Sequence, residues 1–483
     1  MIELHAKIHD RFSIEFKIGF VARKRREISD FVMSTWIFIP GTLDINPFTY
    51  GKDAFYRDIK SYLRLITPVY PLAGIARPGD DPARLLEEAA RRLLDPRARP
   101  DDAARHRARV NMFASILKSA LRDELAHVKQ NPVEEDTRYL CREYARDVAR
   151  VTTAYRRLGR LVNLPTVPRA CIEHHRTGDE FISNAIEQNT HALLAYLDGI
   201  YPDPADPVKE APRQLLRDEV AYKRARGYPR VKENDDGENR DFIARAGLLK
   251  RHVEADLFLA ARKRSNTFVI EQLLFSLAAG LAMIFATAVA FAVQREYGNF
   301  TMPLFVALVV SYMLKDRIKE LARHYFAHNL GTRYFDHKTR ISHRETPLGW
   351  SKEGVDFIAA GKVPAAVTAI RDRSPLPGER GAEEKVLLYR ERVQFKRKQL
   401  PGDYSFPGIH DIIRFNVSEF CRKMDNPAVP LHFMTDTGER RVIQGDKVYY
   451  LNFIMQCRYE KQLEYKRYRV VFNRAGIISL DTP

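Results

Sequence analysis

The feature that most constrains this chain is an uninterrupted run of uncharged residues in its second half. Twenty-one residues without a charge extend from Leu273 to Val293. As a helix rising about 1.5 Å per residue, the run would measure roughly 31 Å, close to the ~30 Å hydrocarbon thickness of a bilayer. We therefore predict a transmembrane helix over about 268–293.

A second uncharged run, 298–314, follows after a short polar turn that contains Gly298 and Asn299. Its helical length is about 25 Å, which alone would be ambiguous between a membrane span and a buried helix. Because a chain that has crossed a bilayer must return or stay across, we predict a second span over about 299–314. The pattern thus indicates a two-helix transmembrane hairpin. A buried hairpin in a soluble protein is the alternative.

Basic residues flank both ends of this segment. They are Arg262, Lys263 and Arg264 before the first run and Lys315, Arg317, Lys319 and Arg323 after the second. The turn between the runs holds only Arg295, next to Glu296. Because cytoplasmic flanks carry an excess of Lys and Arg, we predict an integral inner-membrane protein with two spans and both termini in the cytoplasm.

Alanine recurs every fourth residue along the first predicted span. The four positions are Ala278, Ala282, Ala286 and Ala290. Small residues at this spacing allow close approach of a second helix inside a membrane. The partner is either the second helix of the same hairpin or another copy of the chain in a homo-oligomer.

Apolar residues also recur at helical spacing on both sides of the hairpin, over 242–260 and 318–325. We therefore predict that both helices continue into the cytoplasm as an antiparallel stalk. The remaining sequence has an α+β pattern, with alternating strands such as Phe12–Phe20 and Leu387–Phe395, and a segment at Ile409–Met424 that we interpret as an amphipathic helix. The predicted parts are an N-terminal α+β part (1–77), a linker zone (78–102), a helical subdomain (103–230), the stalk with its hairpin (241–331) and a C-terminal α+β domain (345–483). Whether the N- and C-terminal strands share one sheet stays open.

Three potential metal ligands lie four residues apart just after the second predicted span: Glu320, His324 and His328. On a helix they would project from one face, but the outer two would be about 12 Å apart, so one ion could bind only two of them. Further ligands would have to come from residues such as His337, His343, His174 or His175. A solvated polar face on the helix is the alternative, and the cofactor stays unknown.

The chain carries a formal net charge of +17, which favours anionic partners. We predict contacts with anionic lipid headgroups or phosphate at Arg23, Lys24, Arg25, Arg26, Arg262, Lys263, Arg264, Arg390, Arg392, Lys396 and Lys398. Their expected nearness to the membrane favours lipid over nucleic acid. The alternative is that basic residues protect exposed strand edges from aggregation.

Local motifs for nucleotide hydrolysis, dinucleotide binding, serine hydrolysis and zinc proteolysis are absent from the sequence. This leads to a prediction of a membrane-anchored cytoplasmic protein that binds, scaffolds or regulates a protein partner. One alternative is a metal-dependent juxtamembrane oxidoreductase or hydrolase that uses His324 and His328. A further alternative is an oligomeric two-helix membrane effector.

Overall fold

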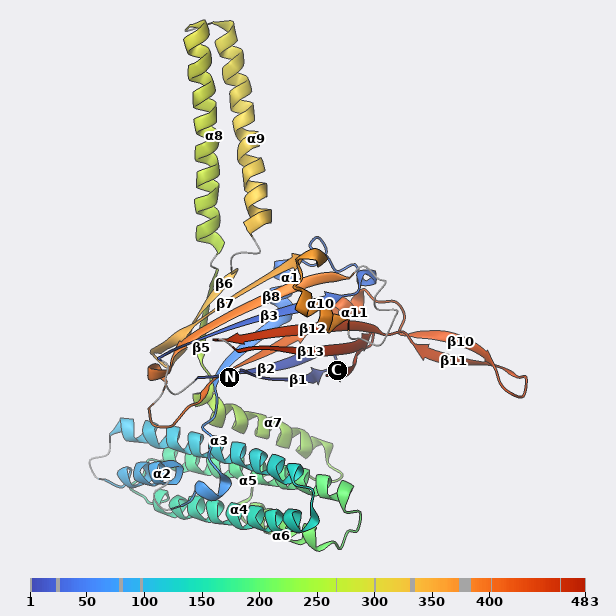
Figure 1. Cartoon of the computed structure of the whole chain (residues 1–483). Helices are drawn as coiled ribbons and strands as arrows, with labels where there is room; N and C mark the ends of the chain where they lie inside the picture. The colour runs from blue at the N-terminus through green and yellow to red at the C-terminus, as the bar shows by residue number, and fades with distance from the viewer. Residues whose placement is uncertain are drawn as a thin grey trace. The chain divides into compact units, whose positions relative to one another are not determined.

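The computed structural model describes residues 2–22, 27–77, 81–95, 99–265, 267–298, 301–330, 335–372, 384–400, 402–460 and 462–482. The chain forms two compact units. The first comprises Met1–Arg64, Leu259–Leu400 and Gly408–Pro483, and the second comprises Leu65–Phe258 and Pro401–Pro407. The first unit holds the β-sheets, whereas the second is helical (Figure 1).

An eight-stranded antiparallel sheet dominates the first unit, with the strand order β14-β13-β12-β3-β8-β7-β6-β5. The strands are β3 (Ile28–Ile39), β5 (Ala260–Ser265), β6 (His337–His343), β7 (Thr346–Ile358), β8 (Lys385–Lys396), β12 (Tyr449–Tyr459), β13 (Gln462–Asn473) and β14 (Gly476–Asp481). The N-terminal strand β3 lies between β12 and β8 from the C-terminal part. The N- and C-terminal strands therefore share one sheet, which the sequence had left open.

A second sheet of four strands has the order β1-β2-β9-β4. Its strands are β1 (Ile2–Asp10), β2 (Ser13–Val21), β4 (Ile59–Leu65) and β9 (Gly408–Asn416). Here too a C-terminal strand, β9, pairs with the N-terminal strand β2. The first unit therefore cannot assemble until distant parts of the chain have met.

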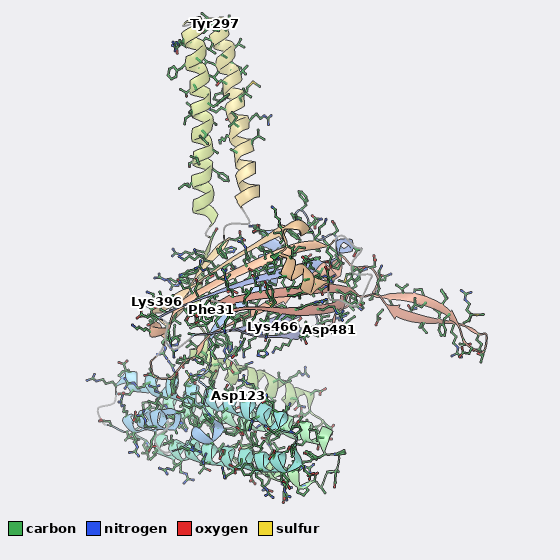
Figure 2. All side chains as sticks on the ribbon, viewed as in Figure 1. Phe31, Asp123, Tyr297, Lys396, Lys466 and Asp481 are labelled. Atoms are coloured by element: carbon green, nitrogen blue, oxygen red, sulfur yellow. The ribbon has the colours of Figure 1, made fainter. Side chains whose placement is uncertain are left out.

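The core of the first unit is aromatic and lies where the two sheets pack together. Phe16 contacts Phe453 with ring centroids 5.2 Å apart, and Phe20 contacts Phe31 at 5.0 Å. Figure 2 labels Phe31 within the larger sheet. One end of the outer face of that sheet is covered by α10 (Ala365–Arg371), which packs over a cluster of buried apolar residues: Trp36, Phe38, Val386 and Ile454.

The second unit is a bundle of helices. They are α2 (Asp81–Arg92), α3 (Pro100–Gln130), α4 (Glu134–Val162), α5 (Arg169–Ile200), α6 (Glu210–Arg226) and α7 (Asp236–Glu254).

The first unit also contains two short helices, α1 (Lys52–Asp58) and α11 (Ser418–Arg422). A separate two-stranded ribbon is formed by β10 (Ala428–Met434) and β11 (Arg440–Asp446) (Figure 1).

The helices α8 (Thr267–Tyr297) and α9 (Met302–Leu330) lie side by side (Figure 1). Within the described residues, only the segment Phe275–Tyr297 is long and apolar enough to cross a bilayer, with 23 residues and a mean hydropathy of 2.2. The helix α9 does not qualify because it begins at Met302, so only about 20 Å of it precedes Lys315.

The prediction of a two-span transmembrane hairpin is therefore wrong. The predicted location, in the inner membrane with two spans, is wrong for the same reason. One such helix is weak evidence for a membrane crossing. The fold class is corrected to a mixed α and β architecture with large antiparallel sheets rather than an integral multi-span protein with small β parts.

The predicted continuous stalk is wrong on its upstream side, because α7 ends at Glu254 and the strand β5 intervenes before α8 begins, whereas downstream α9 continues as a helix to Leu330. The apolar face of α7 buries Leu249 and Val253 within the helical unit instead. The segment Ile409–Met424 is not one amphipathic helix. It forms most of the strand β9 and then the short helix α11.

Candidate functional site

The most unusual surface of the first unit belongs to α8 and α9, whose large apolar side chains are exposed. They include Leu273, Leu277, Leu281, Ile284, Phe291, Met302, Phe305, Val309 and Met313. Small residues lie between the helices instead: Ala278 and Ala282 are each 1% exposed, and the Ser311 hydroxyl donates a hydrogen bond to the Ala286 carbonyl at 3.2 Å. Ala286 and Ala290 are half-buried. Within this chain the alanines therefore line the contact between α8 and α9.

An open apolar groove of about 640 Å³ also lies along the two helices, lined by residues such as Phe285, Val289, Val306 and Leu314. The strand before α8 pairs directly with the strand after α9, so that Ser265 lies opposite His337. Both ends of the helix pair therefore start from the same edge of the eight-stranded sheet.

The predicted metal site is only partly within view. Glu320 lies in α9, but the side chains of His324 and His328 fall outside the described ones. No group of three or more His, Cys, Asp or Glu residues is positioned to hold a metal ion in the part of the chain that the structure describes. His337 instead packs against Tyr56 with ring centroids 4.3 Å apart, and burial lowers its pKa.

The predicted basic residues divide into several settings. Arg23, Lys24, Arg25 and Arg26 lie outside the described residues. Arg262 and Arg264 are exposed on β5, whereas Lys263 pairs with Glu353. On β8, Arg390 lies 3.6 Å from Asp356, and Arg392 bonds both oxygens of Asp30 at 2.9 and 2.5 Å. Lys396 is exposed at the end of β8 (Figure 2), and Lys398 pairs with Glu27.

A pair of buried carboxyl groups joins the two sheets, and the sequence analysis did not identify it. Glu391 on β8 is 4% exposed and Asp411 on β9 is 1% exposed. The Ser61 hydroxyl on β4 donates a hydrogen bond to Asp411 Oδ1 at 2.5 Å. Glu391 Oε2 and Asp411 Oδ2 have no hydrogen-bond donor among the described residues. A proton held between the two carboxyls would satisfy both oxygens.

The electrostatics of this pair favour retention of that proton. Burial raises the pKa of Asp411 to about 6, although hydrogen bonds from Glu391 and Ser61 oppose the rise. Burial and then the charge of Asp411 raise the pKa of Glu391 well above its ordinary value. Two ionised carboxylates cannot share a dry site without a large electrostatic cost, so the pair titrates as a unit.

Further polar groups lie on β7, β8 and neighbouring segments, and the charge of Glu353 acts on Asp411. The Tyr389 hydroxyl donates to Glu353 Oε2 at 3.2 Å. Lys52 bridges Asp336 at 2.7 Å and Asp356 at 3.0 Å. Because these carboxylates are each matched by a donor, the arrangement resembles a structural ion network more than a reactive centre.

The helical unit contains a second buried polar centre, made of histidines. His106 is fully buried, and its ring stacks on that of His175 with centroids 5.7 Å apart. None of the four nitrogens of these two rings has a hydrogen-bond partner among the described residues. Burial lowers the pKa of His106 to about 3 and that of His175 to about 4, so both rings are neutral at pH 7.

The neighbouring His174 belongs to a chain of hydrogen bonds with a defined direction. The Asn111 amide nitrogen donates to Asp256 at 2.9 Å, so its oxygen accepts from His174 Nε2 at 3.0 Å. His174 Nδ1 is then the acceptor for His252 Nε2 at 2.9 Å. The bonds fix the tautomers of both rings, which is typical of a structural network.

Comparison with known proteins adds no assignment: no family model, no curated protein and no solved structure matches this chain.

Proposed function

We propose that this protein is a non-enzymatic binding or scaffolding protein that is held at a lipid surface by the α8–α9 pair. The observation that carries the proposal is the exposure of large apolar side chains along both helices. Soluble monomers rarely expose contiguous apolar patches above roughly a few hundred Å², and larger ones mark contact with a membrane or a partner.

The distribution of these side chains favours lipid as the covering phase. Exposed apolar residues occur around all of α8 except the face against α9, for example at the consecutive residues Met283, Ile284 and Phe285, rather than in one stripe. A protein partner would need to cover only one stripe, whereas a helix that is apolar all round suits lipid. The proposal does not require α9 to cross the bilayer.

We propose a non-enzymatic role because the clusters of titratable side chains are buried. Glu391, Asp411 and His106 are each less than 5% exposed. Groups that act on a substrate must reach it, and these side chains are satisfied by, or packed against, their own neighbours. The two folded units are then the parts that would bind a partner protein.

Flotation of the full chain with neutral phosphatidylcholine vesicles tests the proposal. We expect the wild-type protein to float with the vesicles and the variant Leu281→Asp/Phe305→Asp to remain at the bottom, because a buried charge in lipid costs about 3 kcal/mol. The control Tyr139→Asp/Val231→Asp places the same charges at exposed apolar residues of the helical unit and should float like wild type. Wild-type protein that stays at the bottom, or equal flotation of both variants, would overturn the proposal.

A further inference from the structure

A row of basic residues crosses the outer face of the eight-stranded sheet. The register places Arg264 of β5 opposite Lys338 of β6, and Lys338 opposite Lys352 of β7. Lys352 lies opposite Arg392 of β8. Beyond Arg392, the row passes Val32 of β3 and ends at Arg458 of β12. At about 4.8 Å between strands, it extends roughly 24 Å.

Alternation along the strands shows that these side chains point away from the core. In β6, Thr339 and Ile341 are buried while Lys338 and Arg340 are exposed. In β12, Cys457 and Tyr459 are buried while Arg458 is exposed. The row therefore lies on the side of the sheet that faces away from the four-stranded sheet.

Most of the row has no neutralising partner. Lys338, Lys352 and Arg458 form no ion pair with any described residue, whereas Arg392 is paired with Asp30. The next row on the same face adds Arg262 opposite Arg340, two further exposed cations. Like charges directly opposite each other are destabilising in a sheet, so the surface favours an external anion.

An aromatic side chain lies at the centre of these cations. Three of them lie over the indole ring of Trp350, with Lys352 at 5.0 Å and Lys338 and Arg392 at 5.8 Å from its centroid. Trp350 is half-buried on β7. Tryptophan next to Lys and Arg is typical of protein surfaces at the headgroup level of a membrane.

A shallow hollow of about 270 Å³ lies at the β12 end of the row, lined by residues that include Asp30, Arg392, Arg458 and Glu460. Protection of a strand edge does not account for the row, because among the strands that carry it only β5 lies at an edge of the sheet. The other basic residues of the row lie on interior strands.

We propose that anionic lipid headgroups bind this basic face, which comprises Arg262, Arg264, Lys338, Arg340, Lys352, Arg392 and Arg458 around Trp350. The inference rests on the proposed function, since lipid contact by the α8–α9 pair brings the chain to a bilayer. The edge strand β5 precedes α8 in the chain, and its neighbour β6 follows α9. Headgroup contact by the face gives the membrane association a preference for anionic lipid.

The test compares flotation of the full chain on vesicles of phosphatidylcholine alone and on vesicles that also contain phosphatidylglycerol. At about 0.1 M salt we expect at least about tenfold stronger partition onto the anionic vesicles, and at about 1 M salt this excess should vanish because screening shortens to about 3 Å. Lys338→Glu/Lys352→Glu should remove the excess and leave partition onto neutral vesicles unchanged.

The matched control is Arg138→Glu/Arg142→Glu, which makes the same change in net charge at exposed positions of α4. It should keep the anionic excess within about twofold of wild type, because screening limits the action of distant charges. Thermal unfolding of each variant establishes that it is folded.

The outcomes separate the two proposals. If the wild-type protein does not float with neutral vesicles, the proposed function is contradicted. If it floats equally well with and without phosphatidylglycerol, only the anion-binding face is contradicted. Equal loss of the excess in both charge-reversal variants would reduce the effect to net charge and overturn the inference. Tight binding of a short DNA duplex through Lys338 and Lys352, without an excess on anionic vesicles, would also overturn it.

Discussion

Replacement of Asp411 by Asn should stabilise the folded protein at neutral pH. The carboxyl of Asp411 is buried between the sheets beside Glu391, and its pKa is raised by burial to about 6. Asparagine keeps an oxygen that can accept the hydrogen bond from Ser61, and its amide can donate toward Glu391. The substitution therefore removes the ionisation while it conserves the shape and most of the bonding.

The sign and size of the effect follow from proton linkage. An unfolded Asp has a pKa of about 3.9, so between about pH 4 and pH 6 the folded state of Asp411 binds more protons than the unfolded state. The free energy of unfolding therefore falls as pH rises through this window and is flat above it with respect to this group. Two pH units correspond to about 3 kcal/mol, of which a weaker bond to Ser61 offsets about 1 kcal/mol.

Urea unfolding of wild type and Asp411→Asn at a series of pH values measures this effect. The difference between the two free energies should favour wild type by about 1 kcal/mol near pH 4, where only the weaker bond to Ser61 counts, and favour the variant by about 2 kcal/mol above pH 6. The use of a difference cancels the titrating groups that do not interact with Asp411, so the change with pH reports on the pair of Asp411 and Glu391. Asp436→Asn, at the exposed turn between β10 and β11, serves as the control for loss of one negative charge. A difference that does not change with pH, or one that favours wild type at pH 7, would refute a raised pKa at Asp411.

Two further predictions concern packing in each unit. His106→Leu should reduce the loss of stability at acidic pH. Because the pKa of His106 is lowered in the folded state, only the unfolded state takes up this proton below about pH 6.5. At pH 5 the free energy of unfolding in urea should therefore be about 2 kcal/mol higher for the variant than for wild type. A gain that is the same at pH 5 and pH 8 would contradict this reason. Gly408→Ala should cost more than about 2 kcal/mol, because its added Cβ would lie 1.9 Å from the Phe20 carbonyl oxygen, whereas Gly361→Ala meets nothing within 4 Å and should change the melting temperature little. Equal melting temperatures for the two alanine variants would contradict the close approach of β9 to β2.

Alternation identified the strands β2 and β8, whose inward positions are all or mostly apolar. The strand β2 was predictable because Ile14, Phe16, Ile18 and Phe20 all point into the core. The strand β9 was misread as a helix because its inward positions are Ile409, Asp411, Ile413 and Phe415. One buried acid broke the period of two, and the remaining isoleucines then matched a helical spacing.

A buried acidic residue is also the reason why the carboxyl pair was not predicted. Glu391 lies at an inward position of β8, between Tyr389 and Val393, inside a strand that the alternation did predict. A single carboxylate on the apolar face of a predicted strand was the available signal, since burial of an unpaired charge is costly and implies a partner. The partner itself, Asp411, could not be found because β9 had not been recognised as a strand.

A second membrane span was predicted because the length of the uncharged run was taken as the length of the helix. The run 298–314 has no charge, yet α9 starts only at Met302, so its apolar part is shorter than the uncharged sequence. Gly298 and Thr301, which belong to the uncharged run, are not helical. The metal-binding interpretation of Glu320 stays a prediction, since its partners His324 and His328 have no described side chains.

The basic face could not be predicted from the sequence, because it depends on how the strands pair. Each of Arg264, Lys338, Lys352, Arg392 and Arg458 is unremarkable within its own strand, and their sequence separations run from 14 to 74 residues. A slip of one residue in any strand would turn its cation toward the core. Three opposite pairs of like charges, Arg264–Lys338, Lys338–Lys352 and Lys352–Arg392, oppose folding by about 0.2–1 kcal/mol each. Because the fold does not need these charges for its core, an anion bound at the face accounts for their arrangement better than stability does.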